Sequence, residues 1–371
     1  MSIEALVEIS RFYGSNTEYV IAGGGNTSLK DGETLYIKGS GQALAEAVPD
    51  SFVRMDRKAL AAIWEKSYSD VDAEREKAVL ADLMAARKPG EEQKRPSVET
   101  LLHDLLPFRY VVHLHPALVN GLTCSRQGES AMKEIFGEET IWIPSTNPGF
   151  ILSKKVKTAI ENHKIKHDGL PGIIFLQNHG IFAGSDSIEG IKNIYQDVLG
   201  RLEKRIIKQP DFSIESPETP QTALNETTSA LKEIAGGAAA FFHNREVASL
   251  IQNRSSFYPV SSAFTPDHIV YAGSDPLYTE ASSIAALRED WNNHVEKTGR
   301  IPKICAVRNM GIFGLGRSEN AAALAVELFK DAVKVAVYSE SFGGPLFMSR
   351  EKIDFINNWE VEQFRSKVSV K

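Results

Sequence analysis

Two segments of this sequence repeat one another in register, and this internal repeat is the strongest constraint on the fold. "PGIIFLQNHGIFAGSDSIEGIKNIYQDVLGRLE" begins at Pro171, and "PKICAVRNMGIFGLGRSENAAALAVELFKDAVK" begins at Pro302. The two align without a gap, and each reads as a strand, a turn, a second strand and a helix. We interpret them as a diverged partial duplication. The alternative is two generic strand–turn–helix units that agree by chance.

The repeat predicts two ordered regions with a segment of different composition between them. Residues 208–230 are rich in Pro, Ser and Thr and contain few large apolar residues, which is typical of a linker or an exposed excursion. We therefore expect a first α/β domain over 1–208, a linker over 209–230 and a smaller α/β domain over 231–371. Upstream of the two copies, "IWIPSTNPGF" from Ile141 matches "IVYAGSDPLY" from Ile269, and each is expected to begin with a strand.

Composition and charge exclude several classes of function. The 371 residues include 42 Lys and Arg against 48 Asp and Glu, a net charge of −6, whereas a general nucleic-acid-binding protein needs a basic surface. No apolar run approaches the roughly 18 residues that a membrane span requires, and the first residues lack the pattern of a signal peptide. Two cysteines make no disulfide framework. We expect a cytoplasmic protein that binds neither nucleic acid nor membrane.

Three histidines stand where a metal site would need them. In "VVHLHP", His113 and His115 lie two residues apart and so on one face of a strand. In "FLQNHG", His179 follows an apolar strand at a turn. Three imidazoles with an open fourth position form the ligand set of a catalytic zinc site, and imidazole suits zinc better than magnesium or calcium. The alternatives are histidines on a polar strand face and a histidine that ends a strand. The second copy has Met310 in place of His179.

The segments before these histidines offer an acid and anion-binding groups. Glu99 lies at the start of a predicted helix, one turn before His103; the alternative is an acid that stabilises the helix terminus. "GGGNTS" (23–28) and "KGSG" (38–41) are small-residue turns whose N–H groups suit an oxyanion, and Ser97 stands at the helix start. Each alone is only a turn signal, and "GGGNTS" is neither a dinucleotide fingerprint nor a P-loop.

Taken in order, these motifs resemble the class II aldolase/adducin family. The ordered set is Gly-Asn-Thr-Ser, Lys-Gly-Ser-Gly, Ser-x-Glu, His-x-His-Pro and Asn-His-Gly, over residues of about 10 to 205. Within that family the chain is most similar to the aldolase part of rhamnulose-1-phosphate aldolase/short-chain dehydrogenase fusion proteins. The resemblance implies a three-layer αβα fold around a central, mainly antiparallel sheet. It also implies a homo-oligomer, a tetramer in the relatives.

The resemblance further implies roles for individual residues. It places Zn²⁺ on His113, His115 and His179 and makes Glu99 the catalytic acid/base. It places the substrate phosphate near four residues, which are Asn26, Ser40, Gly41 and Ser97. Relatives carry a second hydroxyl residue directly before the glutamate, where this chain has Val98, so one phosphate donor is missing.

The implied activity is zinc-dependent aldol cleavage of a deoxy-ketose 1-phosphate, such as rhamnulose or fuculose 1-phosphate, to dihydroxyacetone phosphate and an aldehyde. The partner of the protein is then a small sugar phosphate. Two alternatives stay open: a sugar-phosphate 4-epimerase or dehydratase on the same zinc site, and a non-catalytic, adducin-like binding or assembly module.

Overall fold

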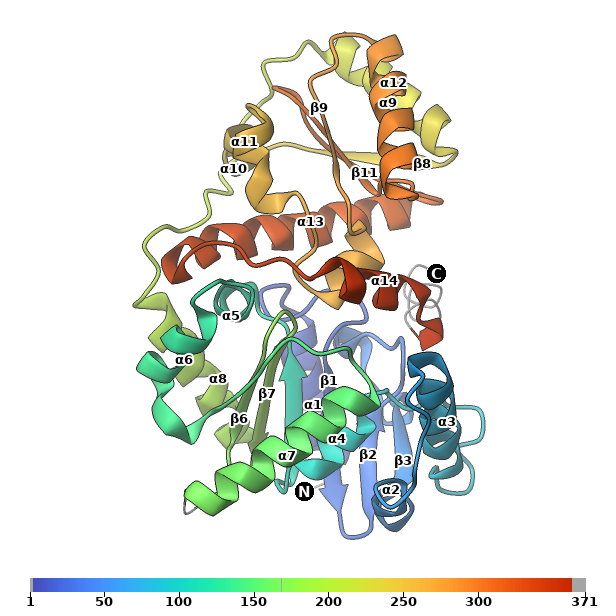
Figure 1. Cartoon of the computed structure of the whole chain (residues 1–371), viewed down its shortest axis with the longest axis vertical. Helices are drawn as coiled ribbons and strands as arrows, with labels where there is room; N and C mark the ends of the chain where they lie inside the picture. The colour runs from blue at the N-terminus through green and yellow to red at the C-terminus, as the bar shows by residue number, and fades with distance from the viewer. Residues whose placement is uncertain (1–2, 168, 362–371) are drawn as a thin grey trace. The chain divides into compact units, whose positions relative to one another are not determined.

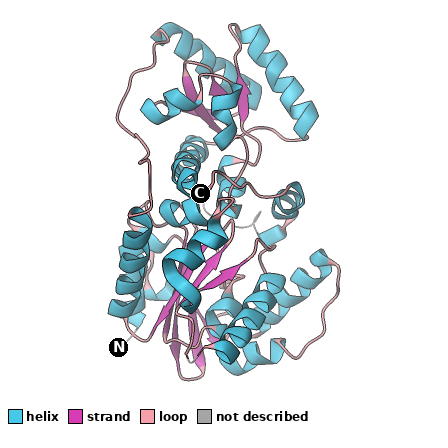
Figure 2. Cartoon of the chain, turned by 60° about the vertical axis from the view of Figure 1, so that its left-hand side comes forward, coloured by secondary structure: helices cyan, strands magenta, loops and turns pink. Residues whose placement is uncertain are grey.

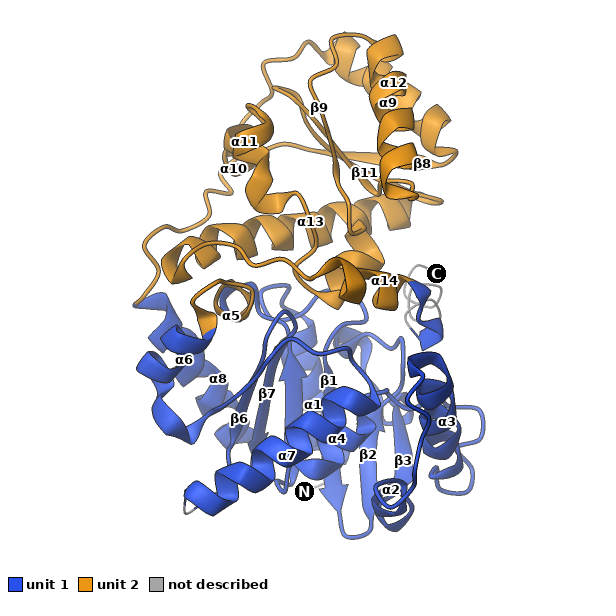
Figure 3. Cartoon of the chain, viewed as in Figure 1, with its two compact units in different colours: residues 1–119, 129–204, 358–369 blue, residues 120–128, 205–357, 370–371 orange. Residues whose placement is uncertain are grey.

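The computed structural model describes residues 3–167 and 169–361, which form two compact units (Figure 1; Figure 3). Among the described residues, unit 1 comprises 3–119, 129–204 except 168, and 358–361, and unit 2 comprises 120–128 and 205–357. Each unit has its own sheet with helices packed on it (Figure 2). In the part of the chain that is described, no helix has both the length and the apolar character to cross a membrane.

Unit 1 is built on a seven-stranded sheet. In sheet order, the strands are β3 (Phe52–Asp56), β2 (Thr34–Lys38), β1 (Asn26–Asp31), β4 (Tyr110–Leu114), β7 (Gly180–Ser185), β6 (Ile173–Leu176) and β5 (Ile141–Ile143). Neighbouring strands are antiparallel except β5 and β6, which are parallel. The helices from the first residues to Glu203 are α1 (Ile3–Gly14), α2 (Arg57–Ile63), α3 (Asp72–Ala85), α4 (Thr100–Leu105), α5 (Ala117–Thr123), α6 (Gly128–Phe136), α7 (Phe150–Lys166) and α8 (Ile188–Glu203). The predicted αβα fold with a mainly antiparallel sheet is confirmed.

Helices cover both faces of this sheet (Figure 1). On one face α4 and α7 pack on the strands, with Leu102 of α4 and Val111 of β4 in one buried cluster. On the other face lies α8, whose Tyr195 donates from Oη to the carbonyl oxygen of Val112 at 3.0 Å. Because successive residues of a strand point to opposite faces, His113 lies on the face that α4 and α7 cover.

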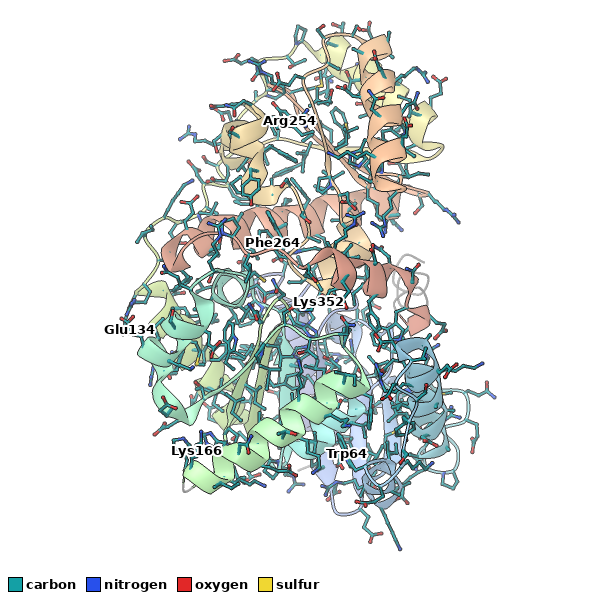
Figure 4. All side chains as sticks on the ribbon, in the orientation of Figure 1. Trp64, Glu134, Lys166, Arg254, Phe264 and Lys352 are labelled. Carbon is teal, nitrogen blue, oxygen red and sulfur yellow. The ribbon has the colours of Figure 1, made fainter. Side chains whose placement is uncertain are left out.

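The outer strands of the sheet have a core of their own. Strands β2 and β3 pack against α2 and α3 through Leu35, Val53, Leu60 and Leu83. Trp64, labelled in Figure 4, follows α2 and stacks on Phe150 with ring centroids 5.7 Å apart. This packing anchors the β1–β2 hairpin, from which Asn26 reaches the site described below.

Unit 2 has a four-stranded sheet. In sheet order, the strands are β8 (Ala238–Phe242), β11 (Gly311–Gly316), β10 (Ile304–Val307) and β9 (Leu277–Thr279). The helices from Gln221 onward are α9 (Gln221–Ala235), α10 (Arg245–Leu250), α11 (Arg254–Phe257), α12 (Ile284–Thr298), α13 (Glu319–Ser339) and α14 (Arg350–Asn358). Short 3-10 helices in the chain are η1 (Leu44–Glu46), η2 (Pro49–Ser51), η3 (Gly137–Glu139), η4 (Tyr258–Val260) and η6 (Glu340–Phe342), and η5 (His268–Ala272) is π-helical.

The four-stranded sheet of unit 2 repeats four adjacent strands of the seven-stranded sheet of unit 1. Strands β8, β11, β10 and β9 stand in the order of β4, β7, β6 and β5, and in both units the last pair is parallel while the other pairs are antiparallel. Helix α12 lies between β9 and β10 as α7 lies between β5 and β6, and α13 follows β11 as α8 follows β7. The similarity therefore extends well beyond the two aligned segments.

One match predicted from the sequence is wrong. The run His268–Ala272 was expected to be the counterpart of strand β5, but it forms the π-helical turn η5. The strand that pairs in parallel with β10 is β9, which begins at Leu277. All five residues of η5 are buried, and a short, continuous apolar run has the same appearance in a buried strand as in a buried helical turn.

The bounds expected for the linker and the domains also differ in detail from those of the helices and units in the structure. Helix α9 begins at Gln221 and so includes the last part of the segment expected to be a linker. Residues 120–128 belong to unit 2, where Arg126 N donates to Gly344 O at 3.1 Å and Leu346 N donates to Cys124 O at 2.8 Å. These contacts join segments far apart in the chain, which composition cannot reveal. The domain limits at 208 and 231 stay a prediction.

Candidate metal centre and active site

His113, His115 and His179 come together in unit 1. Their ring nitrogens offer ligand atoms that all lie within 4.8 Å of one another. Nε2 of His113 is 2.9 Å from Nε2 of His115 and 3.4 Å from Nε2 of His179. The first two residues come from β4 and its end, and His179 comes from the turn between β6 and β7. These histidines form a group that can hold a divalent metal ion.

The ring of His113 is fixed so that Nε2 faces the other two histidines. Its Nδ1 lies 2.9 Å from the carbonyl oxygen of Ile181. A carbonyl oxygen only accepts, so Nδ1 carries the proton and the lone pair of Nε2 faces the other two rings. The ring also stacks on Phe182, with centroids 4.0 Å apart and planes 13° from parallel. A backbone carbonyl that orients a histidine in this way is characteristic of metal-binding histidines.

The Asn-His-Gly motif shapes the turn that carries His179. Asn178 has a φ of 60°, in the left-handed region that Asn tolerates better than most residues. His179 N then donates to Leu176 O at 3.1 Å and closes the turn. A Cβ on Gly180 would lie 2.4 Å from Leu114 O and 2.7 Å from Cδ2 of His115. Only glycine therefore lets β7 start this close to β4.

Glu99, the residue before α4, completes the group. Its Oε1 lies 3.5 Å from Nε2 of His113 and 3.6 Å from Nε2 of His179. The side chain is buried, and Oε1 has no hydrogen-bond partner. A buried carboxylate oxygen without a donor is costly, so this oxygen calls for a cation or a ligand at this point.

The donor set and its spacing fit a metal ion. Two tetrahedral ligands at zinc–nitrogen distances of about 2.0–2.1 Å stand about 3.3–3.4 Å apart. The separation of 3.4 Å between Nε2 of His113 and His179 matches that geometry, and the 2.9 Å between His113 and His115 is shorter. Three nitrogen ligands from two adjacent strands, with a carboxylate beside them, leave room for a further ligand.

Asn26 and Ser97, two of the predicted phosphate-site residues, touch Glu99. Asn26 is the direct partner of His113 in the pairing of β1 with β4. Its Nδ2 donates to Oε2 of Glu99 at 2.6 Å and to Oγ of Ser97 at 3.3 Å. Ser97 Oγ also accepts from Glu99 N at 3.2 Å. Strand pairing thus joins residues that are more than 70 positions apart.

The other two predicted phosphate-site residues, Ser40 and Gly41, lie in the loop after β2. Ser40 N donates to Arg95 O at 2.8 Å, and Gly39 forms an isolated bridge with Pro96. The loop therefore runs beside the segment that leads to Ser97. The backbone N–H of Ser40 is used within the fold, so it is not one of the free donors expected from "KGSG".

Lys38, which the sequence analysis did not single out, joins the two glycine-rich loops. Its side chain is buried, and Nζ donates to Gly23 O at 3.0 Å and to Gln42 O at 2.7 Å. One ammonium group thus fixes both loops and places a positive charge between them. The signal was present as the lysine of "KGSG", but its partners are visible only in the folded chain. The contact of Phe182 with His113 was missed for the same reason.

The corresponding positions in unit 2 carry different side chains. The register of β8 on β11 places Phe241 where His113 stands and His243 where His115 stands, and Met310 replaces His179. The sequence analysis missed His243 because it did not align the segment that contains β4 with any part of unit 2. The ring of His243 hydrogen-bonds the backbone of Met310, and burial lowers its pKa.

Comparison with known proteins assigns the chain to a family. The model of the Class II Aldolase and Adducin N-terminal domain matches residues 4–195, just over half of the chain. The chain belongs to the class II aldolase and adducin family.

Individual relatives are distant. The chain is 20% identical to "Uncharacterized oxidoreductase YuxG" of Bacillus subtilis, with 98% of this chain and 58% of that protein aligned, so it spans little more than half of the length of this curated relative. Among solved structures, it resembles the N-terminal class II aldolase domain of a protein from Thermoplasma acidophilum (27% identity, 55% of this chain and 93% of that one, TM-score 0.46). It also resembles the L-fuculose-1-phosphate aldolase of Thermus thermophilus (16%, 54% and 89%, TM-score 0.34).

Proposed function

We propose that unit 1 is a zinc-dependent aldolase that cleaves a deoxy-ketose 1-phosphate, of the rhamnulose or fuculose type, to dihydroxyacetone phosphate and an aldehyde. The observation that carries the proposal is the position of Glu99 Oε1, buried without a hydrogen-bond partner and 3.5–3.6 Å from Nε2 of two of the three histidines. Membership of the class II aldolase and adducin family supports the reaction class.

The histidines favour zinc as the metal. The expected ligand atoms are all ring nitrogens, from His113, His115 and His179. Zinc accepts nitrogen ligands more readily than magnesium or calcium does. When bound, the ion supplies Lewis-acid stabilisation for the negative charge that forms on the substrate oxygens as the C3–C4 bond breaks. The chain's own contribution is to hold the three rings in place, for which the contacts of His113 with Ile181 O and Phe182 are the means.

Glu99 is the proposed acid/base. Its Oε2 is held by Asn26, while Oε1 points at the histidine nitrogens. A carboxylate held in this way can take and return the proton at C3 of the triose half, which is the task of a general acid/base. A carboxylate that is held in place reacts faster than a mobile one, because orienting the reacting groups beforehand lowers the activation barrier.

The phosphate is proposed to bind near Asn26, Ser40, Gly41 and Ser97. The amide of Asn26 and the hydroxyl of Ser97 already bond to each other and to Glu99, so they place any phosphate close to the reacting centre. Lys38 adds a buried positive charge between the two loops. Val98 stands where relatives have a hydroxyl, so the proposed phosphate site has one donor fewer.

Two further proposals concern the context of the site. The curated relative has "oxidoreductase" in its name and is longer than the region it shares with this chain, which supports a correspondence to the aldolase part of an aldolase–dehydrogenase fusion protein. A homotetramer is proposed from the family alone. A 4-epimerase or dehydratase would use the same histidines and glutamate, and an adducin-like module would need none of them.

A panel assay tests the proposal. The purified chain is incubated with rhamnulose 1-phosphate, fuculose 1-phosphate and ribulose 5-phosphate, with and without a chelator. We expect chelator-sensitive release of dihydroxyacetone phosphate from a deoxyhexulose 1-phosphate. Epimerised pentulose phosphate without release would favour the epimerase, and loss of water from a substrate would favour the dehydratase. Activity that persists in metal-free protein and in the presence of the chelator would overturn every proposal that uses the zinc site.

A further inference from the structure

A line of buried polar contacts leads from the core of unit 1 to Glu99. Oγ of Ser28 lies 2.7 Å from Nδ1 of His103. Nε2 of His103 hydrogen-bonds Oδ1 of Asn26, and Nδ2 of Asn26 donates to Oε2 of Glu99 at 2.6 Å. All four side chains are buried, and Ser28 and His103 have no exposed surface. The family motifs and the proposed reaction assign no role to His103.

The chemistry of the groups fixes the direction of every bond in this line. A carboxylate only accepts hydrogen bonds, so Asn26 must turn its NH₂ group to Glu99 and its carbonyl to His103. A carbonyl oxygen also only accepts, so the proton of His103 must be on Nε2. In a neutral ring Nδ1 is then an acceptor, and the hydroxyl of Ser28 donates to it.

We propose that His103 is a positioning residue for the acid/base glutamate: its Nε2–H fixes the amide of Asn26, and the amide in turn holds Oε2 of Glu99, so that Oε1 stays aimed at the histidine nitrogens. The catalytic part of this proposal rests on the proposed role of Glu99. Without the donor at His103, the Asn26 amide is free to turn over, and its oxygen would then face the carboxylate.

The surroundings of His103 keep it neutral, as the line of bonds requires. Burial lowers its pKa well below the ordinary value, and the nearby amine groups of Lys30 and Lys38 act in the same direction. The ring packs edge-on against Phe182, with centroids 5.3 Å apart, and this is the same phenylalanine that stacks on His113. One aromatic ring thus orients both a metal-binding histidine and the start of the line to Glu99.

The first test does not depend on catalysis. Nitrogen-15 NMR of histidine-labelled full-length chain reports which ring nitrogen carries the proton, and the His103 signals are identified by their loss in His103→Gln. We expect a neutral ring protonated at Nε2, in contrast to His113, whose proton is expected on Nδ1. A His103 ring protonated at Nδ1, or at both nitrogens, at neutral pH overturns the proposal.

The second test compares two replacements of His103. Leu has no donor, whereas the side-chain NH₂ of Gln can reach the place of Nε2. We expect His103→Leu to lower kcat about 10- to 100-fold, the range for residues that orient catalytic groups, with KM and bound zinc nearly unchanged, and His103→Gln to recover most of the loss. The matched control is His268→Gln, a buried histidine of unit 2 that bonds Asp331 at 2.9 Å; its kcat should stay at the wild-type value.

The possible outcomes separate this proposal from the proposed function. Unchanged kcat in folded, zinc-loaded His103→Leu overturns the positioning role, and so does a loss of zinc that accounts for the whole effect. If His103→Leu does not fold, a His103→Gln variant with wild-type stability but without recovered activity overturns it as well. If the wild-type chain cleaves no sugar phosphate, the proposed function fails, and the proton position on His103 still decides whether the line of bonds to Glu99 exists.

Discussion

His179 and Met310 occupy the same position in two copies of one turn. Each follows an Asn in the left-handed region, Asn178 with a φ of 60° and Asn309 with a φ of 57°. Each donates its backbone N–H across the turn, to Leu176 O at 3.1 Å and to Val307 O at 3.0 Å. The turn thus has the same hydrogen bond and the same left-handed Asn in both units, but it presents an imidazole in unit 1 and a thioether in unit 2.

This relationship predicts one bound metal ion per chain. Phe241 and Met310 stand in unit 2 where His113 and His179 stand in unit 1, so unit 2 lacks two of the three nitrogens. Metal analysis of the purified protein should give about one zinc per chain. Met310→His should leave that ratio at one, because Phe241 still takes the place of one of the three ligands. A ratio near two in the wild-type chain would contradict the prediction.

Removal of the acid and removal of a ligand should have separable effects. Glu99→Gln keeps the shape of the side chain and should lower kcat by about 10²- to 10⁴-fold, the usual contribution of a general acid/base, with zinc retained. His113→Ala should lose the zinc itself, because Nε2 of this ring is one of the three expected ligand atoms and lies 3.4 and 2.9 Å from the other two. Activity assays paired with metal analysis check both. Full activity in Glu99→Gln would show that another residue is the base.

A single methyl group at Gly180 should damage the metal site. The added Cβ of Gly180→Ala would overlap the backbone at Leu114 O and the ring of His115, so the start of β7 must move, at a cost of about 1–3 kcal/mol or more in the free energy of unfolding. We expect weaker zinc binding in a chelator competition. The control is Gly200→Ala in α8, where nothing lies within 4 Å of the added atom; it should stabilise the fold by about 0.5–1 kcal/mol. Equal zinc affinity in both variants would refute the steric argument.

Lys30 should make stability depend on pH in the alkaline range. Burial lowers its pKa from 10.5 to about 7 in the fold, and Nζ donates to Phe108 O at 2.9 Å. Between pH 7 and 10.5 the unfolded chain therefore binds more protons at this lysine than the folded chain does, so stability rises with pH across that window. The expected contribution is on the order of a few kcal/mol.

The comparison of wild type with Lys30→Met isolates this effect from other titrating groups. The free energy of unfolding, measured by denaturant titration at several pH values from about 6 to 10, should rise more steeply for the wild type than for the variant. Relative to the wild type, the free energy of unfolding of the variant should be raised most at the acid end of this pH range, where Lys30 carries its buried charge. Parallel curves for the two proteins would mean that Lys30 keeps its ordinary pKa in the fold.

Much of the site could be predicted from the sequence because the motifs are local. His113 and His115 share a strand face by the period of two, and Asn178 and Gly180 mark a turn whatever surrounds it. The repeat in register predicted two related sheets. The match of Ile269 to Ile141 failed because a short apolar run does not distinguish a strand from a helical turn.

The sequence by itself determined the family, the αβα class, the turn that carries His179 and the residue types of a metal centre, since these follow from spacing and from local backbone preference. Only the tertiary structure decided which groups meet. The pairing of β1 with β4 sets Asn26 opposite His113 and thereby links Ser28, His103 and Glu99 into one line. Strand register and helix docking bring these side chains together across more than 70 residues, and no periodicity in a single chain encodes which strands will become neighbours.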